Sequence, residues 1–206
     1  MCPAKRTRLP PRTRLDLTRR TDAREPRPYI LIVCEGTKTE PQYFKGFRLT
    51  NAVVKVRPTG KDTVDVVHEA DRLRNDREEG YDQVWCVFDR DSFPPQRFLD
   101  ALRLAGSLGI EVAYSNACFE VWFLLHFYDH TASLTPHDCC QKLSKLMGQP
   151  YMKGRLGIYD LLQKQQPDAV KRAERLLCGC SPPRPESDNP STTVHLLVKE
   201  LNRFLR

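Results

Sequence analysis

The chain has 206 residues, of which 40% are hydrophobic and 29% are charged, a balance typical of one globular domain with room for a helical extension. Its longest apolar stretch is too short to cross a bilayer, and its basic start lacks the apolar core of a secretory signal. We therefore expect a cytoplasmic protein that has no membrane partner. The eight cysteines lack the paired spacing of a zinc site and are expected to stay reduced.

The net charge of +7 is concentrated in residues 1–28, which contain nine Lys or Arg against three acidic residues. This segment predicts a flexible basic arm that binds a polyanion. A solubilising tail, or a strap that lies on an acidic face of the same domain, is an equally open interpretation. The residues expected to contact nucleic acid are Arg12, Arg14, Arg19 and Arg20 of the arm, together with Lys38 beyond it.

Residues 29–128 predict an α/β core. Continuous apolar runs of strand length occur at 29–34 and 84–88, and 53–57 and 110–114 also indicate strands. Helical signals lie between and after them: a Thr37-x-x-Glu40 capping-box spacing that opens a helix to about residue 48, and helices over 63–79, 94–108 and 119–127. Alternation of strands and helices at these lengths predicts a mostly parallel sheet flanked by helices.

Residues 129–206 predict a mostly helical extension that packs on this core, with no clear strand. Four prolines and a glycine between 178 and 190 indicate a loop. A closing helix follows, in which Val194, Leu197, Val198, Leu201 and Leu205 share one face. The chain has no phosphate-binding G-x-x-x-x-G-K-[ST] loop, so any nucleotide hydrolysis that drives the system must come from another chain.

Acidic residues follow two of the apolar strands. Glu35 ends the first strand, and Asp89 and Asp91 end the run at 84–88. In a parallel sheet these ends meet at one edge, where ligands bind, and oxygen ligands of this kind suit Mg²⁺ or Mn²⁺. A lone Asp-x-Asp after a strand is commonly a turn or a helix cap. The combination with Glu35 favours a metal site, because buried carboxylates are costly without a cation.

The residues around these strands resemble known families. Cys34 to Glu40 after an apolar strand, followed about fifty residues later by Val87 to Asp91, resembles the Toprim signature of primases, topoisomerases and OLD-family nucleases. More narrowly, the Glu35 segment through Tyr43-Phe44, the segment from Ser115 to Phe127, and the late 189–192 segment are similar to the RloB family. Ala117 stands where that family's pattern has proline after Ser-Asn.

The resemblance implies a Toprim-type, Rossmann-like core and a metal-dependent phosphodiesterase. It implies that Glu35 and Glu40 bind one metal ion with the Asp pair, while a later Ser/Glu segment and a lysine complete the site. The metal ligands so implied are Glu35, Glu40, Asp89, Asp91 and Glu120, and the catalytic residues are Glu35, Asp89, Asp91, Glu120 and Lys153, with Ser115 as a further candidate. A first-turn acid favoured by the helix dipole is the alternative for Glu120, and a surface lysine is the alternative for Lys153. His126 is interpreted as a hydrogen-bonded core residue.

The function that the resemblance implies is a Mg²⁺-dependent nuclease acting on RNA, tRNA included, or on DNA, in phage defence or abortive infection. The implied partners are nucleic acid and an AAA or ABC-type ATPase in trans, and a homo-oligomer remains open. One alternative is a catalytically silent Toprim subunit of a defence complex that binds a phosphate or a nucleotide. Another is a nucleotidyl-transfer enzyme that makes a signal at the same metal site. The sequence does not separate these alternatives, because all of them need Mg²⁺ and a bound phosphate.

Overall fold

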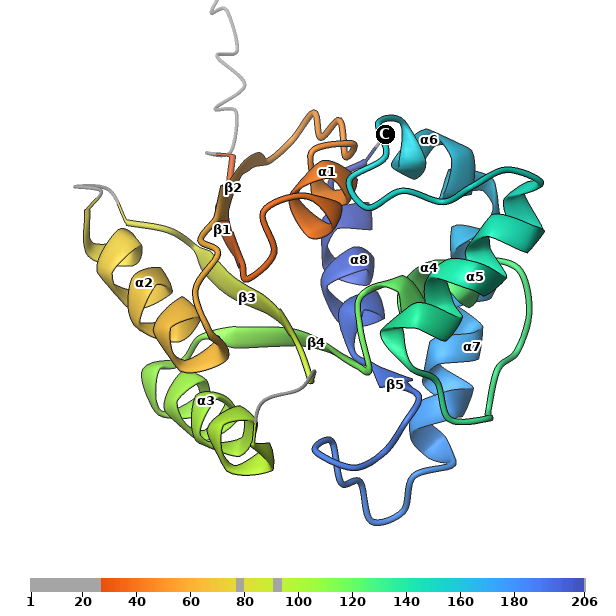
Figure 1. The fold of residues 1–206 in the computed structure, drawn as a ribbon. Coiled ribbons are helices and arrows are strands. Elements are labelled where there is room, and N and C mark those ends of the chain that lie inside the picture. The colour runs from red at the N-terminus through yellow and green to blue at the C-terminus, as the bar shows by residue number, and fades with distance from the viewer. Residues whose placement is uncertain (1–26, 77–79, 91–93, 206) are drawn as a thin grey trace, which may run out of the picture.

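The structure is a computed structural model that describes residues 27–76, 80–90 and 94–205. Its centre is a five-stranded sheet in the order β2-β1-β3-β4-β5 (Figure 1). The first four strands in this order are parallel, and β5 runs antiparallel to β4. The strands are β1 (Tyr29–Cys34), β2 (Val53–Pro58), β3 (Gln83–Asp89), β4 (Glu111–Asn116) and β5 (Ser191–Thr192). The predicted α/β class with a mostly parallel sheet is confirmed.

Helices cover both faces of the sheet. On one face lie α2 (Thr63–Asn75) and α3 (Pro95–Leu108). The other face carries α1 (Thr39–Phe44) and the elements after β4, which are α4 (Glu120–Leu124), α5 (Pro136–Met147), α6 (Ile158–Leu162), the 3₁₀ turn η1 (Gln163–Gln165), α7 (Gln166–Cys178) and α8 (Val194–Asn202).

The central strands are apolar on both faces because each face packs against helices. In β3, Cys86 and Phe88 belong to the cluster under α2 and α3, whereas Trp85 and Val87 belong to the cluster on the opposite face. This alternation follows from the two-residue period of a strand. It directs Asp89, the next residue in the odd-numbered series, toward the face that α1 and α4 cover.

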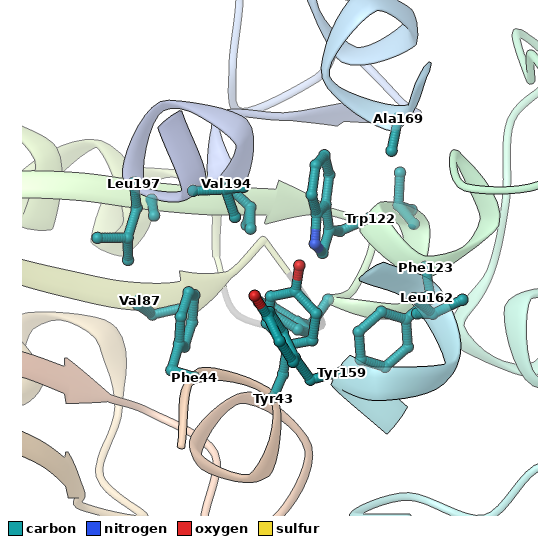
Figure 2. Close-up of a cluster of buried hydrophobic side chains, with 14 of the residues drawn as sticks. Tyr43, Phe44, Val87, Trp122, Phe123, Tyr159, Leu162, Ala169, Val194 and Leu197 are labelled. Carbon is teal, nitrogen blue, oxygen red and sulfur yellow. The ribbon is translucent and has the colours of Figure 1, made fainter. Parts of the chain in front are cut away.

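The core on that face is aromatic and joins the two parts of the chain. Tyr43 of α1 packs edge-on against Phe119 and also contacts Phe123 and Tyr159, with ring centroids 5.5 to 5.8 Å apart. Figure 2 shows side chains of α1, α4, α6 and α8 meeting in this cluster. The helices after residue 128 therefore complete the core of the sheet.

The chain order of the strands creates a crevice between β1 and β3. From β1 the chain passes through α1 to β2 on one side, and from β2 it returns through α2 on the opposite face to β3. Helices on opposite faces diverge at such a switch point, and ligands of open parallel sheets bind there, beyond the carboxyl ends of the strands. Glu35 and Asp89 are the residues at these two strand ends.

The expectation of no strand after residue 128 is wrong. Ser191 and Thr192 form β5 and pair with Asn116 and Ser115 of β4. A two-residue strand is too short to show a periodic pattern. Hydrogen bonds hold it in place instead: the buried Thr192 Oγ1 contacts Ser115 Oγ at 3.0 Å and Tyr114 O at 3.0 Å.

The predicted capping box at Thr37 is also absent. Helix α1 begins at Thr39, its N-cap is Lys38, and no side chain caps it. The side chain of Glu40 cannot close the box because its carboxylate lies against Gly36. The helix ends at Phe44, and α4 is likewise shorter than the aromatic run 119–127 suggested.

Candidate metal and phosphate site at the carboxyl edge of the sheet

Glu35 and Asp89 lie together at the carboxyl ends of β1 and β3. The backbone N–H of Asp89 donates a hydrogen bond of 3.0 Å to Oε2 of Glu35, and the N–H of Glu35 donates one of 2.8 Å to Val87 O. These two bonds join Glu35, at the end of β1, to β3. The predicted meeting of Glu35 and Asp89 at one sheet edge is therefore present. Asp91 lies outside the described residues.

The Asp89 carboxylate is buried and has acidic neighbours. Its Oδ1 is buried and has no hydrogen-bond partner among the residues that the structure describes. Burial raises the pKa of Asp89 well above its ordinary value, and the neighbouring charges of Glu40, Glu120 and Glu35 raise it further. A backbone hydrogen bond at Phe119 opposes this rise, but because Oδ1 has no partner an ionised carboxylate here is only partly compensated.

Glu40 approaches the same place from the first turn of α1. Its side chain is 6% exposed, and a Cβ atom at Gly36 would come within 2.2 Å of its Oε2. Gly36 thus leaves the space that the carboxylate occupies. Burial raises the pKa of Glu40, and the charge of Glu120 adds to this rise, although backbone hydrogen bonds and Lys153 oppose it.

Glu120 enters from α4 and is 1% exposed. Tyr151 donates its hydroxyl to Oε1 of Glu120 at 3.1 Å, and Nζ of Lys153 lies 4.0 Å from the same oxygen. Burial lowers the pKa of Lys153, but Glu120 and other negative groups nearby, including Asp89, leave it above its usual value. Lys153 is therefore a fixed positive charge beside the acidic cluster. Tyr151 was not singled out in the sequence, because only contact with Glu120 reveals its role.

One cavity of about 440 Å³ lies among Glu35, Glu40, Asp89 and Lys153. Acidic side chains come from the ends of β1 and β3 and from α1, and lysines come from three separate loops. The lining residues are Glu35, Gly36, Thr37, Lys38, Thr39, Glu40, Gly60, Lys61, Asp62, Asp89 and Lys153. A hollow that combines carboxylates with lysines can bind a cation and a phosphate together.

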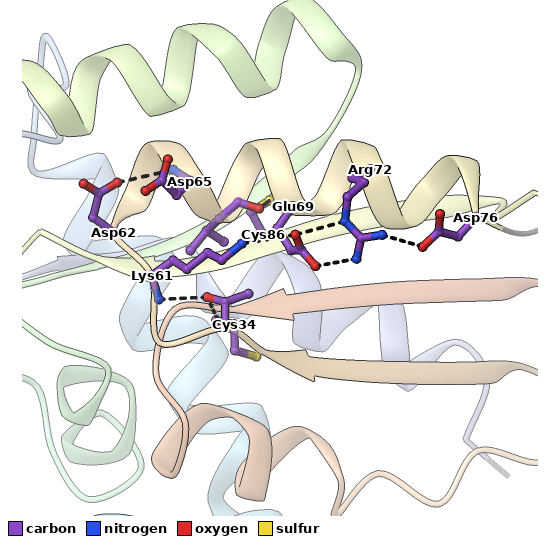
Figure 3. Close-up of polar contacts among 10 residues, drawn as sticks. Cys34, Lys61, Asp62, Asp65, Glu69, Arg72, Asp76 and Cys86 are labelled. Atoms are coloured by element: carbon purple, nitrogen blue, oxygen red, sulfur yellow. Dashed lines mark hydrogen bonds and ion pairs between the residues drawn. The ribbon is translucent and has the colours of Figure 1, made fainter.

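The loop between β2 and α2 is a part of this cavity that the sequence did not predict. The Gly60 N–H donates to Glu35 O at 2.9 Å, and Thr59 Oγ1 donates to Cys34 O at 3.1 Å, so the loop is fastened to the end of β1. Lys61 then reaches Glu69 at 3.2 Å (Figure 3). Hydrogen bonds from Arg72 and Lys61 lower the pKa of Glu69 to about 2. No periodicity or motif marks such a loop, because only strand register places it.

The remaining residues singled out in the sequence lie in different places. Ser115 is completely buried, is bonded to Thr192 and does not line the cavity. His126 is 2% exposed and its Nδ1 lies 2.9 Å from Trp122 O, which confirms the core interpretation. Lys38 lines the cavity and is exposed. The predicted arm residues Arg12, Arg14, Arg19 and Arg20 lie outside the described residues.

Mg²⁺ can be tested against this arrangement. Within residues 27–76, 80–90 and 94–205, no three His, Cys, Asp or Glu side chains are gathered so as to hold a metal ion by themselves. Proteins commonly bind Mg²⁺ through one or two carboxylates, with water and substrate phosphate as the remaining ligands. The paired Glu35 and Asp89, and the unpartnered Oδ1 of Asp89, fit that mode of binding.

A larger hollow of about 670 Å³ lies at the other end of β3 and β4. Its polar groups already bond to each other or to the backbone: Gln83 donates to Glu200 at 2.6 Å, and Asp82 accepts from the Tyr29 N–H at 2.6 Å. It faces the amino ends of the strands, where open parallel sheets do not bind their ligands. The carboxyl-edge cavity is therefore the candidate site.

Comparisons with known proteins bear on the family of the chain. In the described part of the chain no helix has the length and apolar character needed to cross a membrane. Neither the curated proteins nor the solved structures gave a match. The model of the RloB-like protein family, in contrast, matches residues 30–201 and so includes every element from β1 to α8. The chain belongs to the RloB-like protein family.

Proposed function

We propose that this protein is a Mg²⁺-dependent nuclease that hydrolyses a phosphodiester of RNA or DNA in the carboxyl-edge cavity, in the setting of phage defence. The observation that carries the proposal is the convergence of Glu35, Asp89, Glu40 and Glu120 beside Lys153 at the switch point of the sheet. Glu40, Glu120 and Glu35 all raise the pKa of Asp89, and carboxylates crowded in this way need a cation when they are ionised together. A structural role as turn or helix caps does not require this convergence.

Glu35 and Asp89 would hold the ion, with Asp91 beyond the described residues, and Glu40 and Glu120 would add negative charge around it. Bound Mg²⁺ would stabilise the charge that develops on the phosphate and lower the pKa of an attacking water. Two contacts already present orient the ligands. The Asp89 N–H fixes the Glu35 carboxylate, and the Tyr151 hydroxyl fixes that of Glu120.

Lys153 has a separate role. Its ammonium group is more than half exposed and stands at the rim of the cavity, 4.0 Å from the Glu120 carboxylate. A phosphate oxygen that enters the cavity would meet this charge, and electrostatic stabilisation of that kind is a large contribution to phosphoryl transfer. Lys38 and Lys61 add positive charge from the loops after β1 and β2.

The test is cleavage of defined substrates by the purified full-length protein, alone and with the product of its neighbouring gene. Labelled single-stranded RNA, tRNA, single-stranded DNA and plasmid are incubated with Mg²⁺, Mn²⁺ or EDTA. We expect cleavage with either metal and none with EDTA, and Glu35→Gln should lower the rate by about a thousandfold or more. Glu111→Gln, an exposed carboxylate at the opposite end of the sheet, should cleave like the unaltered protein. Absence of metal-dependent cleavage in every arm would reject the proposal.

A further inference from the structure

The loop that carries Lys153 exposes two large apolar side chains. Met152 is 74% exposed and Leu156 is 78% exposed. In the part of the chain that the structure describes, the other exposed large hydrophobic residues are Leu146, Leu161 and Leu196, and none exceeds 47%. Single exposed apolar residues are common on protein surfaces. Two of them, both far more exposed than the rest and flanking a lysine of the candidate site, require a different explanation.

The loop is held in place. The Tyr151 N–H donates to Ser144 Oγ at 2.9 Å, and the Tyr151 hydroxyl donates to Glu120 at 3.1 Å. A turn closes between the Arg155 N–H and Met152 O at 3.2 Å. On its other side Gly154 packs on Lys38, where an added Cβ would come within 2.9 Å of the Lys38 Cβ. The segment therefore runs beside α1 (Figure 1), and its Lys153 lines the cavity. Met152 and Leu156 are presented to solvent by a fixed backbone.

The charges of the loop indicate what covers these side chains. Residues 148–157 contain Lys153 and Arg155 and no acidic residue, and both of these basic residues lie between Met152 and Leu156. Lysine is depleted at protein–protein interfaces, so an arrangement with Lys153 between the two apolar side chains is unfavourable for a protein partner. It suits a nucleic acid strand, whose phosphates pair with cations while its bases contact apolar side chains.

We propose that Met152 and Leu156 contact the nucleobases that flank the phosphate in the cavity, so that the preferred substrate is a nucleic acid with unstacked bases, such as a single strand or a loop. The inference rests on the proposed function, because it places the phosphate beside Lys153. Bases inside a duplex are stacked and turn only their edges outward, whereas those of single strands and loops can leave the stack and lie on a protein surface.

The test measures binding in EDTA, so that no strand is cleaved. The probes are a fluorescein-labelled single-stranded DNA 12-mer, a 12-mer with the same phosphates but abasic at its central positions, and a 12-base-pair duplex. We expect the unaltered protein to prefer the strand with bases. Met152→Ala with Leu156→Ala should weaken binding of that strand by about tenfold and leave the abasic strand unaffected. Leu196→Ala, which removes a similarly apolar exposed side chain at the opposite sheet edge, should change neither.

Each other outcome overturns the inference. Equal losses of affinity for the strand with bases and for the abasic strand would mean that the loop contacts phosphate only. Unchanged binding, or no binding of any strand, would leave the apolar pair without a role in nucleic-acid recognition. A loss of self-association or of partner binding in light scattering would assign the surface to a protein. The proposed function can fail separately from the inference. If the protein prefers strands with bases but cleaves none, the inference stands and the function fails. If it cleaves but the double substitution changes no binding, the function stands and the inference fails.

Discussion

Gly36 supports the site by having no side chain. The Glu40 carboxylate fills the space where a Cβ would stand, and that carboxylate is the far end of a flexible side chain. Gly36→Ala should therefore displace Glu40 without unfolding the protein. We expect Mg²⁺-dependent cleavage to fall by at least about tenfold while the melting temperature stays near that of the unaltered protein.

The matched control for this substitution is Gly106→Ala. Gly106 lies in α3 with open space around its Cβ position, so alanine should stabilise the helix by about 0.5 to 1 kcal/mol and leave cleavage unchanged. Cleavage by Gly36→Ala at the unaltered rate would show that the placement of Glu40 does not matter.

His126 makes the stability of the fold depend on pH. Burial lowers the pKa of His126 to about 4, whereas an unfolded chain has a histidine pKa near 6.5. Because the unfolded state binds the proton more readily, stability is complete above about pH 6.5 and is lost as the pH falls toward 4. Between pH 7 and pH 5 the loss from this residue should be about 2 kcal/mol.

Urea unfolding at both pH values measures this effect. His126→Gln should lose less stability between pH 7 and pH 5 than the unaltered protein, since His130 and His195, whose pKa values are also lowered, contribute equally to both proteins. An identical loss in the two proteins would contradict the assignment.

At the level of single residues, the sequence predicted the acidic residues at the ends of β1 and β3. Glu35 and Asp89 could be found because each follows an unbroken apolar run. Lys61 and Tyr151 could not, because a loop joined to β1 by backbone bonds and a hydroxyl that meets Glu120 leave no local pattern. Ser115 was misplaced for a related reason: its partner Thr192 is 77 positions away.

Among the elements, the two-residue strand β5 is expected to contribute substantially to the stability of the fold. The buried Thr192 Oγ1 bonds to Ser115 Oγ and Tyr114 O, and it accepts the Val194 N–H at 3.2 Å. Thr192→Val keeps the shape and removes all three contacts, so the free energy of unfolding should fall by about 2 kcal/mol. Ser107→Ala removes an exposed hydroxyl of α3 and should change it by less than about 0.5 kcal/mol. Denaturant titration compares them, and equal stabilities would show that β5 is dispensable.

The elements that could be predicted are those whose burial is periodic or continuous. The four parallel strands and the helices α2, α3 and α8 agree with their predicted positions within a few residues. The errors fall on β5 and on the ends of α1 and α4. Hydrogen bonds to distant residues determine the position of β5, and the packing of the Glu40 carboxylate against Gly36 affects the start of α1. Local sequence signals cannot contain such information.

For the whole molecule, positive and negative charge are concentrated in different segments. Residues 1–28 carry six of the seven net positive charges, whereas the carboxylates gather at the edge where β1 ends. If the arm binds nucleic acid, deleting residues 1–25 should weaken binding and flatten its dependence on salt. Anisotropy titrations at several NaCl concentrations measure both quantities. An unchanged slope would indicate a strap or a solubility device.

The central claim is that the acidic cluster is a Mg²⁺ site, and the change in melting temperature on adding Mg²⁺ tests it most directly. Ions that bind only the folded state stabilise it, by about 3 kcal/mol at a hundred times Kd. We predict that Mg²⁺ raises the melting temperature of the unaltered protein and of Asp100→Asn, an exposed carboxylate on α3. Asp89→Asn should melt higher than the unaltered protein in EDTA, because a buried carboxylate crowded by other acidic side chains becomes a neutral amide, and should gain nothing from Mg²⁺. An equal response to Mg²⁺ in all three proteins, or none in any, would contradict the account.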